Sequence, residues 1–170
     1  MVVSVNEALR RVGEPFPFSW EGTLEPQKYA GGSVTFVGTA RLSGTYVYDG
    51  KTFRVDANAE ASYETTCARC GRPTVQKLSF PISERFVRSV FKTEDDELYP
   101  YEGERLDLTE AFFDNLFLEM PMTTVCSELC KGLCPVCGAD LNRGQCSCQS
   151  AKVDARLSAL GTLLNDHKEV

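Results

Sequence analysis

The sequence predicts an α+β protein. We expect an antiparallel sheet, strongly curved or barrel-like, followed by a helix, a cysteine-rich ribbon-like segment and a C-terminal helix. Three observations lead to this fold class. Apolar and polar residues alternate along much of the first hundred residues, apolar residues recur every fourth position after 107, and eight cysteines stand in short clusters. The predicted division is a mainly β domain over 1–124 and a cysteine-rich segment over 125–170.

The strand signal is strongest over 53–64, where every second residue from Phe53 to Tyr63 is apolar and the residues between are polar. Such a period of two places one set of side chains in a core and the other in water, as in a half-buried antiparallel strand. The stretch 34–48 also alternates, and Asp49-Gly50 is a typical hairpin turn between the two. The pattern continues around Pro81, which indicates an edge strand or a bulge there.

Two helices are expected from apolar stripes. The first lies near 107–120: the sequence from Asp107 to Glu110 resembles a capping box, and Pro121 ends the helix. Its stripe consists of Leu108, Phe112, Leu116 and Met120. The final helix begins near Asp154, and its stripe consists of Leu157, Leu160 and Leu164. We interpret both stripes as core-facing, because this spacing is typical of amphipathic helices that pack on a domain.

Composition narrows the class of protein. The 170 residues have ordinary globular composition and a formal net charge of −6, from 18 basic and 24 acidic residues, which excludes a generally basic nucleic-acid-binding surface. No apolar run approaches the roughly 20 residues of a membrane span. The first residues lack the basic and apolar stretches of a secretory signal. The sequence therefore predicts a cytoplasmic protein with no membrane partner.

The cysteines carry the clearest chemical signal. They are Cys67, Cys70, Cys126, Cys130, Cys134, Cys137, Cys146 and Cys148. Because no export signal accompanies them, clustered thiols favour metal ligation over a disulfide scaffold. The single histidine, His167, lies outside every cluster. Any metal site is therefore expected to be all-thiolate.

Spacing predicts how the ligands group. Cys67–Cys70 and Cys134–Cys137 are C-x2-C-Gly turns, which present two thiolates to one ion. With Cys146 and Cys148, the second turn supplies four soft ligands within fifteen residues, as in a closed tetrahedral zinc site. Cys126 and Cys130 are four residues apart and would share a side of a helical turn. We expect them to join Cys67 and Cys70 in a second site, so that the protein holds two zinc ions.

Other groupings remain open at this stage. The two C-x2-C turns could form one site together, leaving the sulfurs of Cys126, Cys130, Cys146 and Cys148 for the other. The first pair could instead be reduced, uncoordinated thiols, or a dithiol redox motif beside Arg69. Iron–sulfur ligation is a further possibility, although C-x8-C between pairs suits a zinc ribbon better than ferredoxin spacing.

The sequence gives no indication of catalysis. A four-thiolate site has no open coordination position, and neither a histidine base nor a glycine-rich phosphate loop accompanies it. We therefore expect no enzyme activity and no small-molecule substrate. A cluster of basic residues around the first turn is a candidate nucleic-acid contact, with a solvated, partly neutralised face as the simpler interpretation. Its members are Arg69, Arg72, Lys77, Arg85, Arg88 and Lys92.

Several motifs together resemble the YceD-like family of large ribosomal RNA subunit accumulation proteins. They are Cys67-x-x-Cys70, Leu118-x-Met-Pro121, Asp154-Ala-Arg-Leu157 and the long motif Cys130-Lys-Gly-Leu-Cys134-Pro-Val-Cys137-Gly-x-Asp-Leu-Asn142-x3-Cys146-x-Cys148. The resemblance runs from about Thr66 to Leu164. One departure from the family pattern is Ala155, which stands where the family usually has proline.

The resemblance implies a bacterial or plastid factor needed for the synthesis, processing or stability of 23S ribosomal RNA. Its partner would be a large-subunit rRNA precursor, a ribosomal protein, or both. The alternative from the residues alone is a zinc-dependent protein adaptor, or a thiol-based redox switch, that makes no direct RNA contact.

Overall fold

The computed structural model describes residues 1–29, 32–92 and 97–148. The chain forms two compact units. The first, here called the sheet unit, comprises Met1–Cys67 and Arg72–Cys126. The second, the cysteine unit, comprises Ala68–Gly71 and Ser127–Val170. The helix expected from Asp154 onward lies outside the described residues.

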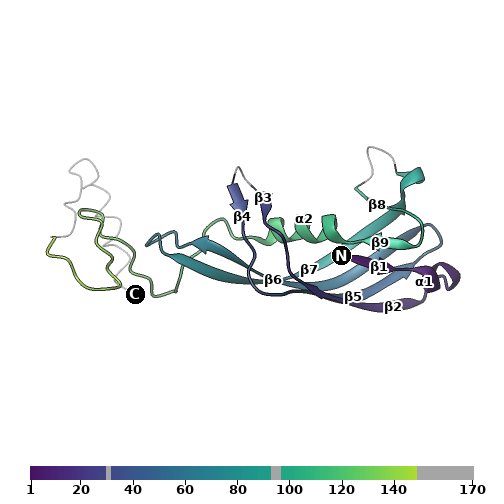
Figure 1. Cartoon of the computed structure of the whole chain (residues 1–170), viewed down its shortest axis with the longest axis horizontal. Coiled ribbons are helices and arrows are strands. Elements are labelled where there is room, and N and C mark those ends of the chain that lie inside the picture. Colours follow the sequence, from purple (N-terminus) through teal and green to yellow (C-terminus); the bar gives the residue numbers. More distant parts are fainter. Residues whose placement is uncertain (30–31, 93–96, 149–170) are drawn as a thin grey trace, which may run out of the picture. The chain divides into compact units, whose positions relative to one another are not determined.

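The sheet unit is built on five strands in the order β2-β5-β6-β7-β8 (Figure 1). Their bounds are β2 Pro15–Gly22, β5 Ala40–Tyr48, β6 Thr52–Thr66, β7 Pro73–Arg88 and β8 Tyr99–Tyr101. The first four pair antiparallel, and β8 runs parallel to the last three residues of β7. The two long central strands, β6 and β7, are joined by the turn that carries Cys67 and Cys70.

The prediction of a barrel-like sheet is wrong, because the sheet is open, with β2 and β8 at its edges. Closure would require the two edge strands to pair with each other. Instead, one face of the sheet is covered by the helix α2 (Thr109–Glu119), whose buried side chains join those of the strands in one core (Figure 1). The sheet is also not wholly antiparallel. No sequence pattern marked β8, since it has three residues and contains Pro100.

The remaining elements are short. Strand β1 (Val2–Ser4) pairs with β9 (Arg105–Asp107), and β3 (Gln27–Tyr29) pairs with β4 (Gly32–Val34). The helices are α1 (Asn6–Arg10), the 3-10 turn η1 (Ser89–Phe91) and α2 (Thr109–Glu119). Among the described residues, none of these helices has the length and hydrophobicity that a bilayer span requires.

The alternation over 53–64 is confirmed in β6. Phe53, Val55, Ala59, Ala61 and Tyr63 are buried, and the residues between them are exposed or half-buried. The hairpin turn at Asp49-Gly50 is also confirmed. The carboxylate of Asp49 accepts hydrogen bonds from the backbone N–H groups of Lys51 and Thr52, at 2.8 and 2.6 Å. In contrast, 34–48 is not one strand, because β4 ends at Val34 and β5 begins at Ala40.

The core lies between α2 and the sheet. The stripe predicted for this helix is confirmed, since Leu108, Phe112 and Leu116 are buried. Phe112 packs edge-on against Phe80 of β7, with ring centroids 5.5 Å apart. At the start of the helix, Asp107 accepts a hydrogen bond from the N–H of Thr109 at 3.0 Å, which satisfies one of the donors left free in a first turn.

The opposite face of the sheet is polar and solvated. Its charged side chains form ion pairs: Arg41 with Glu21 at 3.4 Å, Arg54 with Asp56 at 3.0 Å, and Lys77 with Glu60 at 3.4 Å. Because these charges pair with one another, this face of the sheet has little net charge.

The expectation that Pro81 lies at an edge is met, because β8 pairs with β7 only at Phe86–Arg88. The stretch of β7 around Pro81 is therefore bonded to β6 alone.

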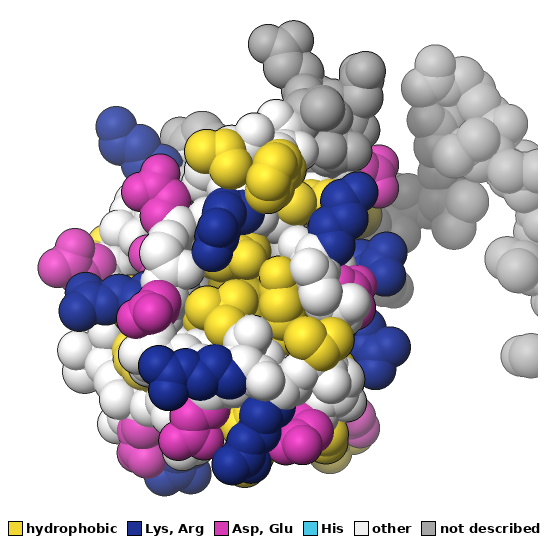
Figure 2. Space-filling view, turned by 90° about the vertical axis from the view of Figure 1, so that its right-hand side faces the viewer, with side chains coloured by type: hydrophobic (Ala, Val, Ile, Leu, Met, Phe, Trp, Pro, Cys, Tyr) yellow, Lys and Arg dark blue, Asp and Glu magenta, His cyan; other side chains and the backbone are white. Residues whose placement is uncertain are grey.

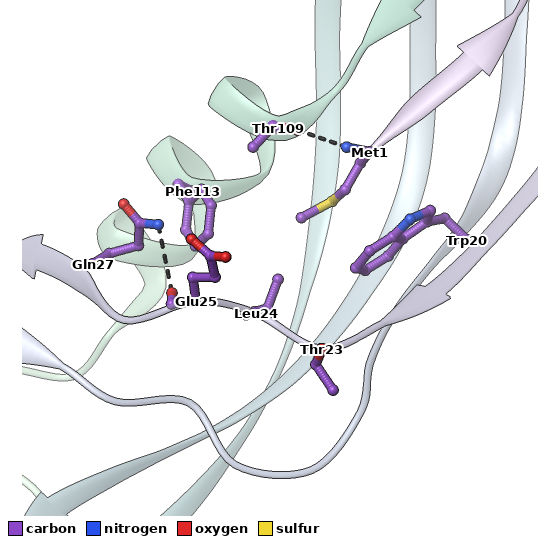
Figure 3. A pocket seen from close by; sticks show the side chains of 8 residues that line it. All are labelled: Met1, Trp20, Thr23, Leu24, Glu25, Gln27, Thr109 and Phe113. Carbon is purple, nitrogen blue, oxygen red and sulfur yellow. Dashed lines mark hydrogen bonds between the residues drawn. The ribbon is translucent and has the colours of Figure 1, made fainter.

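A pocket of about 220 Å³ opens beside α2 (Figure 3). Its lining is Met1, Trp20, Thr23, Leu24, Glu25, Gln27, Thr109 and Phe113. The terminal amine of Met1 donates a hydrogen bond to Thr109 Oγ1 at 2.7 Å. These residues pair no nucleophile with a base, so we assign no chemistry to this pocket.

Gly44 tests how tightly the sheet is packed. It lies in β5 between Phe18 of β2 and Ala57 of β6. A Cβ atom at this position would collide with the carbonyl oxygen of Asp56 and would lie 2.5 Å from Ala57 Cα. We expect Gly44→Ala to lower the free energy of unfolding by about 2 kcal/mol or more, since the obstacle is backbone. Ser43→Ala, on the solvated face, is the control, and equal denaturation midpoints for the two variants would contradict this.

Candidate metal centres

The structure brings the eight cysteines together as two groups of four. Group 1 is Cys67, Cys70, Cys126 and Cys130, and group 2 is Cys134, Cys137, Cys146 and Cys148. Within each group the sulfur atoms all lie within 4.8 Å of one another. These are the sets favoured from spacing, and the two C-x2-C turns do not share a group. Each group can hold a metal ion.

The group 1 residues of the sheet unit are positioned by the ends of β6 and β7. The N–H of Cys67 donates to the carbonyl of Arg72 at 2.9 Å and closes the turn, with Gly71 at a φ of +67° that a side chain would disfavour. Cys126 follows a segment attached to the same two strands. Gln76 Nε2 donates to the carbonyl of Val125 at 3.3 Å.

The group 1 residues of the cysteine unit are held by two side chains. Arg69 donates from Nη1 to the carbonyl oxygens of Glu128 and Cys130, at 3.1 and 3.0 Å. Asn142 accepts a hydrogen bond from the N–H of Lys131 at 2.8 Å and donates from Nδ2 to Cys130 Sγ at 3.5 Å. The residues after Cys130 are thereby fastened both to the first C-x2-C turn and to the segment beyond the second.

Group 2 is built on a second tight turn. The N–H of Gly138 donates to the carbonyl of Cys134 at 2.9 Å, and Gly138 has a φ of +73°. The N–H of Val136 points at Cys134 Sγ, 3.4 Å away. A bridge between Leu133 and Asp140 closes the base of this turn. A backbone N–H directed at sulfur stabilises a thiolate, which is the form that binds metal.

The thiols of group 2 influence one another strongly. The N–H groups of Cys137 and Val136, with a hydrogen bond from Cys146, lower the pKa of the Cys134 thiol to about 6. A hydrogen bond with Cys137, desolvation and the nearby negative charges raise the pKa of Cys148 to about 12. For Cys146, the N–H of Cys148 acts to lower the pKa, but Cys134 and desolvation together raise it. One thiolate therefore forms easily, whereas four thiolates need a cation among them.

The cysteine unit has few buried side chains to hold it together. Three large apolar residues described in this unit are exposed, Leu129 by 87%, Val136 by 61% and Leu133 by 44%, and Leu141 is half-buried. Cys70, Cys130 and Cys134 are buried. A segment that buries three cysteines and none of its described leucines lacks the packing energy of a hydrophobic core. Metal–sulfur bonds are the interactions available to replace it.

The six basic residues singled out from the sequence are not brought together as one patch. Lys77 and Arg85 are eight residues apart along β7, which corresponds to about 26 Å. Lys77 pairs with Glu60. Arg69 bonds backbone carbonyls, and Arg72 donates to Cys126 Sγ at 3.8 Å. Arg88 and Lys92 are exposed at the far end of β7.

At that end of β7 the sheet register adds a basic residue that sequence order conceals. Arg54 of β6 lies directly opposite Arg85. Figure 2 views the molecule from the side where α1 and β8 lie, and shows hydrophobic side chains gathered at the centre with Lys, Arg, Asp and Glu side chains around them. Exposed apolar residues in the elements at this end are Val2, Val12, Val90 and Phe91. The surface there is therefore mixed rather than uniformly basic.

Sequence reasoning found the eight cysteines but missed the polar side chains that support them. Asn142 stands inside the cysteine motif with no predicted role, yet its amide fastens Lys131 and Cys130. Gln76 and Thr65 have no predicted role either, yet they anchor Val125 and Thr124. An asparagine inside a cysteine motif was a usable signal for the first. Nothing local indicated the other two.

The fold and the two groups define a class of protein: a chain with a sheet unit and a cysteine unit, whose eight cysteines form two groups that could each hold a metal ion. Residues 55–164 match the family model described as large ribosomal RNA subunit accumulation protein YceD. The chain therefore belongs to the YceD family. No solved structure matches it.

Individual relatives match shorter stretches. The chain is 36% identical over 70 residues to large ribosomal RNA subunit accumulation protein YCED homolog 1, chloroplastic, from Arabidopsis thaliana, covering 41% of this chain and 22% of the relative. It is 35% identical over 79 residues to the uncharacterized protein Mb2951c of Mycobacterium bovis, covering 44% and 38%. The maize YCED homolog 1 is 38% identical over 61 residues, covering 35% and 21%. The match thus spans well under half the length of these relatives.

Asn142 provides a test of how the cysteine unit is held. We expect Asn142→Ala to destabilise this unit by about 1 to 2 kcal/mol, because it leaves the N–H of Lys131 and the sulfur of Cys130 without their partner. The measurement is amide hydrogen exchange at Lys131. Gln145→Ala, at an exposed position of the same segment, is the control. Unchanged exchange at Lys131 in the Asn142 variant would show that the amide does not hold this segment.

Proposed function

We propose that this protein is a non-enzymatic accessory factor for the synthesis, processing or stability of 23S rRNA in the cytoplasm, and that two four-thiolate zinc sites stabilise it. The observation that carries the proposal is the pair of four-cysteine groups in a chain of the YceD family. The rRNA role follows the family's description, and the structural role of zinc follows the chemistry of the groups.

Zinc is the ion that suits these groups best. Four thiolates within 4.8 Å of one another provide the soft, tetrahedral ligand set of structural zinc sites. Such a site has no position left for water or substrate, so it stabilises the fold rather than catalysing a reaction. Two sites, each with a net charge of −2, change the formal charge of the protein from −6 to about −10.

Charge also limits how the protein meets RNA. Against such a negative field, binding to naked RNA should be weak and sensitive to salt. Arg85, Arg88 and Lys92 are the basic residues best placed for contact, because Arg69 and Arg72 bond to residues of the cysteine groups and Arg54 pairs with Asp56. We propose a composite partner, in which an rRNA precursor and a ribosomal protein are bound together.

A second candidate is an adaptor or thiol switch that makes no direct RNA contact. The observation in its favour is the neutralised outer face, where Lys77, Arg41 and Arg54 each pair with a carboxylate. An adaptor would associate with precursor particles through protein alone, and removal of RNA would leave that association intact.

Metal removal tests the zinc proposal. We expect two zinc ions per chain, and we expect chelation to abolish amide protection over 127–148, since a structural zinc site contributes on the order of 10 kcal/mol to folding. Strand β6 should stay protected, because its stability comes from the buried core. Elemental analysis and hydrogen exchange measure the two effects. Substantial iron, or unchanged protection over 127–148 after verified zinc removal, would overturn the assignment.

Charge reversal tests the rRNA proposal. We expect Arg85→Glu, Arg88→Glu and Lys92→Glu in one variant to reduce association with large-subunit precursors and to lower 23S rRNA, with zinc content unchanged. The control reverses Lys28, Arg41 and Lys77, which are also exposed, lie away from the Arg88 end of β7 and give the same change in net charge. If the first variant associates normally with the precursors, the adaptor function would be favoured over direct RNA contact through these residues. Full 23S rRNA in cells lacking the protein would overturn the rRNA role itself.

A further inference from the structure

We propose that the two zinc sites differ in their sensitivity to peroxide. Group 2 is a labile site at which Cys137 reacts first and the zinc ion is released, whereas group 1 keeps its ion under the same treatment. This inference rests on the zinc sites of the proposed function. It goes beyond them by assigning a modification site and an order of metal release.

Access to sulfur distinguishes the two groups. In group 1, Cys67, Cys70 and Cys130 are exposed by 2%, 6% and 5%, and Cys126 is half-buried. In group 2, Cys134 is exposed by 7%, whereas Cys137 is exposed and both Cys146 and Cys148 are half-buried. A peroxide must reach a thiolate directly in order to oxidise it. Group 2 therefore presents reactive sulfur to solvent and group 1 shields most of its own.

Hydrogen bonding to sulfur adds to the difference. In group 1, side chains from elsewhere in the chain reach the ligands: Arg72 donates to Cys126 Sγ, and Asn142 donates to Cys130 Sγ. Donors of this kind fix ligand orientation and disperse thiolate charge, and their loss commonly weakens metal binding 10- to 100-fold. In group 2, Cys134 Sγ accepts a hydrogen bond from the N–H of Val136, which lies in the same turn. This hydrogen bond is lost when the turn unfolds.

The oxidation is balanced. The thiolate of Cys137 attacks one peroxide oxygen and the O–O bond breaks, which leaves a sulfenic acid and one water after protonation. A neighbouring thiolate of group 2 then attacks the sulfenic sulfur, a disulfide forms and a second water leaves. Two thiolates have lost two electrons and hydrogen peroxide has gained them. The two remaining thiolates take up protons, and Zn²⁺ is released.

Loss of this ion should unfold one part of the cysteine unit. Because Val136 is exposed, no apolar core would hold the second turn after its ion leaves. The residues before the second turn remain fastened to Arg69. Its guanidinium donates to the carbonyls of Glu128 and Cys130, and its backbone carbonyl accepts a hydrogen bond from the N–H of Leu133 at 3.2 Å. The structural response then covers 134–148. It takes the Asn142 donor away from Cys130 Sγ, whereas group 1 keeps the Arg72 donor to Cys126 Sγ and its buried thiols.

Peroxide titration of the full chain tests the order of release. The protein is first shown to contain two zinc ions under reducing conditions, and is then treated with hydrogen peroxide while free zinc is followed with a colorimetric chelator. We expect one ion to leave at least 10-fold faster than the other. Mass spectrometry at that stage should place the disulfide within group 2, with Cys137 as one partner, and should find the group 1 thiols reduced.

Two variants at matched positions of the C-x2-C turns sharpen the test. The Cys137→Ser chain should keep one ion that resists the same peroxide dose, and the Cys70→Ser chain should keep one ion that is released quickly. Should Cys70→Ser fail to fold, the disulfide map of the unaltered protein decides. Simultaneous release, or disulfides that appear first in group 1, would overturn this inference and leave the zinc sites standing. A reduced protein without two zinc ions would overturn the zinc assignment itself.

Discussion

The ladder between β6 and β7 is the interaction on which the sheet unit depends. It pairs Thr52 with Val87 at one end and Thr66 with Pro73 at the other, so both strands are long and continuously bonded. One face of this ladder carries Phe53, Phe80 and Phe86 into the core, where Phe112 of α2 packs against Phe80. The turn at its end carries Cys67 and Cys70. A single alternation of side chains therefore builds the core and positions the turn that carries two cysteines of group 1.

The cysteine groups obey a different constraint, which is electrostatic. Four thiols held within 4.8 Å of one another cannot all ionise in isolation, as the raised pKa of Cys148 and the lowered pKa of Cys134 show. A divalent cation removes this conflict and turns mutual repulsion into four bonds. The cysteine unit exposes Leu129 and Val136, so apolar burial contributes little to holding its fold.

The YceD family model matches the part of the chain that carries both cysteine groups. It covers 55–164, which also includes most of β6 and all of β7 and α2. Two basic residues within this stretch stabilise the fold itself. Arg69 donates a hydrogen bond to the backbone carbonyl of Glu128, and Arg72 donates one to Cys126 Sγ. Some arginines that the sequence offers for binding a partner, such as Arg69 and Arg72, therefore already form hydrogen bonds within the chain. This favours a partner that is recognised by apolar and polar contacts as well as by charge.

The sequence by itself determined the strands with clear alternation, the core-facing stripe of α2, the turn at Asp49-Gly50 and the cluster of four cysteines from Cys134 to Cys148. Each of these depends on residues close in the chain, where period, spacing and turn chemistry act directly. Tertiary structure alone decided that the sheet is open and that Arg54 lies opposite Arg85. It also decided that β8 runs parallel to β7 and that Asn142 supports Cys130. These features depend on which distant segments meet, and a three-residue strand or a single amide leaves no periodic trace in the sequence from which that meeting could be predicted.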